Sequence, residues 1–139
     1  MAMRPTIDDP LFEGLKRLRA NWPTKGWSWD TRLACVTSSF STEFQDKARA
    51  AAGEALTIEW TPSTLAKAPT PLREIVDRSG GLRAGQLLLA GGVPGGKTAF
   101  GLWWPWGDGF TISCRVGLVG VDPEREPYPR FREVMGVTL

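Results

Sequence analysis

Histidine is absent from the 139-residue sequence. It is the usual general base near neutral pH and the commonest metal ligand in proteins. Its absence therefore excludes a Ser-His-Asp or Cys-His catalytic arrangement, and a histidine-ligated zinc or haem site, within this chain. The acidic residues form no recognisable catalytic pair. The sequence names no catalytic residue and favours a protein without enzyme activity.

Cysteine is scarce. Cys35 and Cys114 lie far apart and form no Cys-x-x-Cys pair. Two thiolates cannot complete a structural zinc site, so we expect no metal. Because a free cysteine behaves as a small hydrophobic residue, we expect two buried, reduced thiols. A disulfide between them is the alternative.

Long apolar runs are also missing. No segment approaches the roughly 18 consecutive apolar residues of a membrane-spanning helix. The N-terminal MAMRPTIDDP has neither the apolar region nor the cleavage site of a signal peptide. Seventeen basic and fifteen acidic residues give a net charge of +2, which does not favour nucleic acid as a partner. We expect a cytoplasmic protein that contacts neither a membrane nor nucleic acid.

The hydrophobic and charged fractions, 42% and 23%, are those of a globular chain. The length matches the commonest single-domain size, so residues 1–139 are expected to form one α+β domain. Helices are predicted where apolar residues recur at helical spacing or where capping residues occur. The predicted helices begin at Asp9-Pro10, at Thr42 with Gln45, and at Thr70-Pro71, and a short one covers RFREVM near the C-terminus.

Strands are predicted from β-branched and aromatic composition and from alternation at period two. The sequence predicts one strand over 27–40, a short one over 56–60, and a three-strand meander. The meander comprises GQLLLAGG, the segment around 98–104, and 110–118, with a hairpin turn at Pro105–Gly109. In the last segment Phe110, Ile112 and Cys114 belong to the face expected to be buried. The fold class is a mainly antiparallel sheet covered by helices.

One segment matches a known phosphate-binding pattern. Residues 91–98, GGVPGGKT, satisfy GxxxxGK[ST], and GGLRAGQLLLAGG resembles the segment that leads into this motif in RecA-like ATPases. The resemblance implies ATP binding, with Gly91 and Gly96 in the phosphate loop. It also implies Lys97 on the β- and γ-phosphates and Thr98 on Mg²⁺.

The residues after the motif favour a different structure. Pro94 has no N–H to offer a phosphate, and Gly101 and Pro105 would interrupt the helix that should follow Lys97. The alternation after Thr98 indicates a strand instead. We expect a glycine-rich hairpin connection without a cofactor, and an ATP-binding P-loop protein is the alternative.

Tryptophan is abundant, with seven in the chain. Neighbouring strand residues point to opposite faces, so Trp103 and Trp104 cannot share one core. The sequence therefore predicts a protein-binding surface at Trp103, Trp104 and Trp106, because an exposed tryptophan beside a turn is typical of an interface. The partner is another protein or a second copy of this chain. An internal cluster with Tyr128 and Phe131 is the alternative. The expected function is that of a small non-catalytic binding or adaptor subunit.

Overall fold

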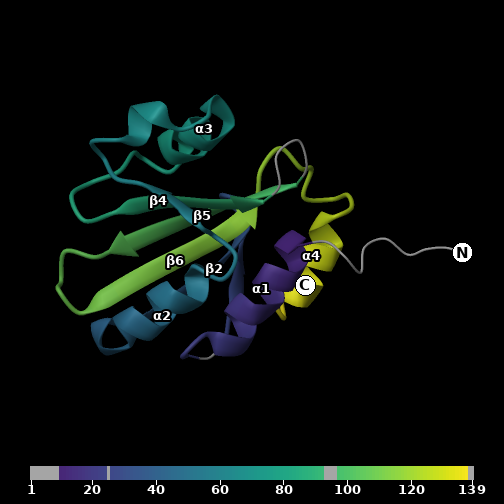
Figure 1. The fold of residues 1–139 in the computed structure, drawn as a ribbon, viewed down its shortest axis with the longest axis horizontal. Coiled ribbons are helices and arrows are strands. Elements are labelled where there is room, and N and C mark those ends of the chain that lie inside the picture. The colour runs from purple at the N-terminus through teal and green to yellow at the C-terminus, as the bar shows by residue number, and fades with distance from the viewer. Residues whose placement is uncertain (1–9, 25, 93–96, 138–139) are drawn as a thin grey trace, which may run out of the picture.

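A computed structural model describes residues 10–24, 26–92 and 97–137. Its strands form an antiparallel six-stranded sheet in the order β1-β2-β6-β5-β4-β3 (Figure 1). The strands are β1 (Ser28–Asp30), β2 (Cys35–Ser41), β3 (Ile58–Trp60), β4 (Leu87–Gly92), β5 (Thr98–Pro105) and β6 (Thr111–Leu118). The helices are α1 (Pro10–Asn21), α2 (Gln45–Ala52), α3 (Thr70–Arg78) and α4 (Tyr128–Val134), with 3₁₀ turns η2 (Thr42–Phe44) and η3 (Leu65–Lys67). The predicted α+β class and the β4-β5-β6 meander are confirmed.

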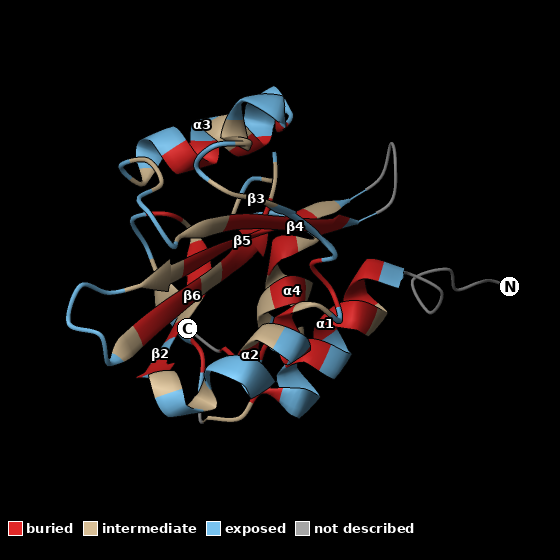
Figure 2. Ribbon diagram, turned by 60° about the vertical axis from the view of Figure 1, so that its left-hand side comes forward, coloured by how far each residue is buried: buried red, intermediate tan, exposed pale blue. Residues whose placement is uncertain are grey.

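Helices cover both faces of the sheet. Helices α1, α2 and α4 lie on one side, and α3 lies apart from them on the other (Figures 1 and 2). Strand alternation sends Leu89, Val116 and Cys114 into the first layer, and Leu88 and Leu102 into the second. The molecule therefore has two cores, one on each face of the sheet.

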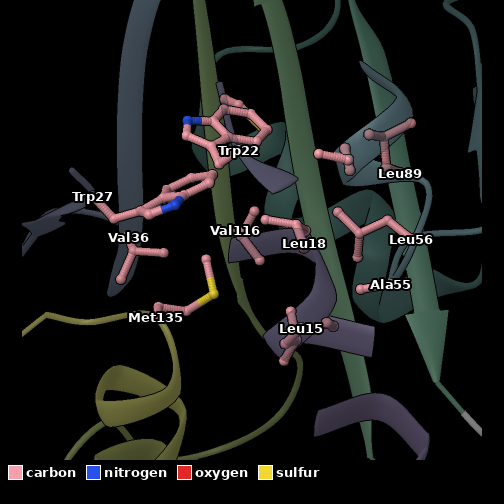
Figure 3. Close-up of a cluster of buried hydrophobic side chains, with 14 of the residues drawn as sticks. Leu15, Leu18, Trp22, Trp27, Val36, Ala55, Leu56, Leu89, Val116 and Met135 are labelled. Atoms are coloured by element: carbon pink, nitrogen blue, oxygen red, sulfur yellow. The ribbon is translucent and has the colours of Figure 1, made fainter. Parts of the chain in front are cut away.

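The larger core lies under α1 and α4. Leu15 and Leu18 of α1 and Met135 after α4 point toward Val116 at the centre of the sheet (Figure 3). Trp22, which directly follows α1, is buried in this core. Its indole Nε1 donates a 3.0 Å hydrogen bond to the buried Ser38 Oγ, so these two buried polar atoms satisfy each other.

The predicted single strand over 27–40 is wrong, because a turn divides it into β1 and β2. One oxygen of the Asp30 carboxylate accepts hydrogen bonds from the backbone N–H of Arg32 (2.9 Å) and Leu33 (3.3 Å). An aspartate that bonds the backbone two residues on initiates a turn. Ala34 then adopts a positive φ of 53°, and β2 returns antiparallel to β1.

The predicted start of the second helix is displaced by a short turn. Ser41, not Thr42, supplies the cap, since its Oγ accepts from the backbone N–H of Glu43 at 3.3 Å. The 3₁₀ turn η2 follows, and α2 begins at Gln45. The α2 face toward the core is made of alanines: Ala48, Ala51 and Ala52 are buried. Asp9, the expected cap of the first helix, lies outside the described residues.

Within the described part of the chain, no helix combines the length and the hydrophobicity that crossing a bilayer requires.

Candidate functional site

The glycine-rich segment does not lead into a helix. Residues 93–96, which include Gly96, lie outside the described residues. Lys97 is exposed, and Thr98 begins β5, which pairs antiparallel with β4 so that Thr98 lies opposite Gly92. A P-loop holds phosphates at the N-terminus of the helix that follows its lysine. A strand occupies that place here, so the helix required by the ATP-binding alternative is absent.

Packing explains why a glycine stands at position 91. A Cβ on Gly91 would lie 1.7 Å from the carbonyl oxygen of Ala55, far inside van der Waals contact. The backbone at 55–56 therefore passes directly over β4, which only a residue without a side chain permits. The Lys97 ammonium lies 5.9 Å from the centre of the Phe12 ring, within cation–π range. Packing and strand pairing thus account for the positions of Gly91, Lys97 and Thr98. The element that follows them is a strand and not a phosphate-binding helix.

The three tryptophans predicted to form a binding surface lie in three different environments. Trp103 is 5% exposed, faces the α1/α2/α4 layer and packs 5.8 Å from the Phe40 ring. Trp104 faces the opposite side, half-buried, with the Arg115 guanidinium 4.8 Å from its ring centre. Trp106 is 53% exposed. Trp103 is therefore a core residue, and its assignment to the surface is wrong, because helices cover that face of the sheet.

Tyr128 and Phe131, which the alternative places in an internal cluster with the hairpin tryptophans, cluster with Trp29 instead. The Tyr128 ring packs against Phe131 at 5.4 Å and against Trp29 at 5.8 Å. Its hydroxyl donates to the carbonyl of Ala34 and accepts from the backbone N–H of Leu118 at 3.1 Å. The C-terminal segment thus packs beside β1, and the aromatic rings that pack on Tyr128 are those of Trp29 and Phe131, not those of the hairpin tryptophans.

The end of the β5–β6 hairpin is the most exposed aromatic part of the described structure. Of the described large hydrophobic residues that are exposed, Trp106 (53%) and Phe110 (73%) lie here, and Ile58 (52%) lies on edge strand β3. Phe110 was expected to be buried, but β6 begins one residue later, at Thr111. The only sequence signal for its exposure is its position directly after Gly-Asp-Gly. We call Trp104, Trp106 and Phe110 the hairpin end.

Hydrogen bonds hold this turn in one conformation. The Asp108 carboxylate accepts from the backbone N–H of Phe110 (2.8 Å) and of Thr111 (3.0 Å), and from the Thr111 hydroxyl (2.9 Å). These bonds stabilise the charged form and hold the pKa of Asp108 below its ordinary value. Trp106 Nε1 donates to Ser113 Oγ at 2.8 Å, which fixes the indole over β6. The aromatic residues are therefore presented from a preorganised turn.

A groove of about 500 Å³ lies beside the hairpin end. One wall is the turn before β4, with Arg83 and Gln86. The other wall is the end of β5 and the residues that follow it. The residues that line the groove are Arg83, Ala84, Gln86, Trp104, Pro105, Trp106 and Gly107. The Gln86 Oε1 accepts from the Arg83 backbone N–H at 2.8 Å, which orients its amide. The sequence alone did not indicate that Gln86 belongs to this groove, because Gln86 lies beside the tryptophans only once the sheet has formed.

A smaller hollow of about 360 Å³ lies between α3 and the loop after β6. Its floor is apolar and includes Ile75 and Phe100, whereas Glu74, Arg78 and Asp122 contribute charges of both signs. Such a mixture selects no single class of ligand. Among residues 10–24, 26–92 and 97–137, no three Cys, Asp or Glu side chains gather as ligands for a metal ion.

The two cysteines are free and buried. Burial raises the pKa of the Cys35 thiol and of the Cys114 thiol to about 12, since a thiolate is poorly solvated in the core. Neither sulfur therefore has the character of a nucleophile or a metal ligand at neutral pH.

No family model, no curated protein and no solved structure matches this chain.

Proposed function

We propose that the chain is a non-catalytic binding protein that contacts another protein through the hairpin end. The observation that carries the proposal is the exposure of Trp106, 53%, on a turn whose conformation is fixed by hydrogen bonds. Tryptophan is enriched among the residues that dominate binding energy, because it buries a large area with few rotamers. The Ser113 hydrogen bond already restricts the indole, so little further side-chain entropy is lost on association.

The position of the hairpin supports the same proposal. The turn lies at the end of the sheet away from α1, α4 and the described N-terminal end (Figure 1). Phe110 adds a second exposed aromatic ring there. A partner, whether another protein or a second copy, can therefore reach both rings without displacing a helix.

Single substitutions test the proposal. Trp106→Ala and Phe110→Ala should weaken association with the partner, by about thirtyfold where the residue is a binding hot spot worth about 2 kcal/mol. Ile58→Ala is the matched control, because Ile58 is equally exposed but lies on edge strand β3, which β4 separates from β5. Sedimentation velocity measures self-association, and cross-linking in cell extract captures a different partner. If Trp106→Ala and Phe110→Ala retain the same assemblies as the unaltered chain, the hairpin end is not the contact surface.

A further inference from the structure

We draw no further inference here: the strongest candidate, a hollow of about 140 Å³ beside the C-terminal ends of α1 and α4, carries none, because the Arg19 guanidinium that lines it already donates to the last carbonyl of α4 at 3.5 Å, and the Trp27 Nε1 and Thr24 Oγ1 atoms, which have no hydrogen-bond partner among the described residues, are too deeply buried for a ligand to reach.

Discussion

Trp103 and Trp104 are adjacent in sequence and lie on opposite faces of β5. Trp103 is packed against Phe40 in the larger core, and Trp106, three residues later, is exposed. We expect Trp103→Ala to lower the free energy of unfolding by about 3–5 kcal/mol, because it leaves a large cavity. Trp106→Ala should change it by less than about 1 kcal/mol. Urea denaturation of the two variants measures both values, and equal losses would show that Trp106 is also part of the packed structure.

The buried thiols make stability depend on pH in the alkaline range. Cys35 and Cys114 have ordinary pKa values of 9.0 that burial raises to about 12 in the folded chain. Above about pH 9 the unfolded chain loses these protons while the folded chain retains them, so unfolding becomes more favourable. Their contribution to stability is complete below pH 9.0 and is lost as the pH rises toward about 12.

We therefore expect the free energy of unfolding to fall as the pH rises from 9.0 to 10.0. The double variant Cys35→Ala and Cys114→Ala should show a shallower fall over the same interval, in urea titrations under matched salt. Tyr128, whose pKa burial raises from 10.0 to about 12, contributes only above pH 10.0. An identical slope in the double variant would contradict the assignment to the thiols.

At the scale of elements, the crossing of residues 55–56 over β4 depends on Gly91. Gly91→Ala would place a methyl group against the Ala55 carbonyl, so we expect a loss of stability of several kcal/mol or a failure to fold. Gly107→Ala is the matched control, because a Cβ there meets nothing within 4 Å and the backbone φ is not positive. Thermal unfolding followed by circular dichroism compares the two. Equal melting temperatures would show that the backbone at 55–56 can shift enough to accommodate the added methyl group.

The β4–β5 pairing also predicts the response to nucleotide. Since a strand follows Lys97, Mg-ATP should leave the melting temperature unchanged, and Lys97→Ala should behave identically with and without it. A true P-loop site would add about 2.7 kcal/mol at a ligand concentration one hundred times its Kd. A thermal-shift titration therefore distinguishes the two structures. A shift that Lys97→Ala abolishes would restore the ATP-binding alternative.

Local sequence signals predicted most of the elements, and tertiary packing decided the rest. The alternation from Thr98 and the turn residues after Pro105 predicted β5 and β6, because strand period and turn chemistry are local properties. The turn at Asp30 was missed, since its carboxylate competes with strand pairing inside an otherwise β-favouring run. Alternation also showed that Trp103 and Trp104 face opposite sides. Alternation could not show which face of the sheet stays exposed to solvent at β5, because that depends on where α3 packs.

At the scale of the whole molecule, the two helical layers differ in extent. The α1/α2/α4 layer covers the larger core, whereas α3 packs alone on the smaller one. Local opening requires less free energy where fewer apolar contacts are broken. We expect backbone amides of α3 to exchange with solvent deuterium faster than those of β5 and β6, which lie inside the sheet. Exchange followed by mass spectrometry measures this, and equal protection would show that both layers open together.

The uneven exposure of the seven tryptophans gives the chain an internal optical reporter. Trp106 alone among them is exposed; Trp22, Trp27 and Trp103 are buried, and Trp29, Trp60 and Trp104 are intermediate. An aqueous quencher such as iodide reaches an exposed indole first, so the earliest fraction of fluorescence lost belongs to Trp106 and emits at the longest wavelength. Anything that covers the hairpin protects that fraction. Binding of a partner at the hairpin can thus be followed in unlabelled protein through the fluorescence of a single tryptophan.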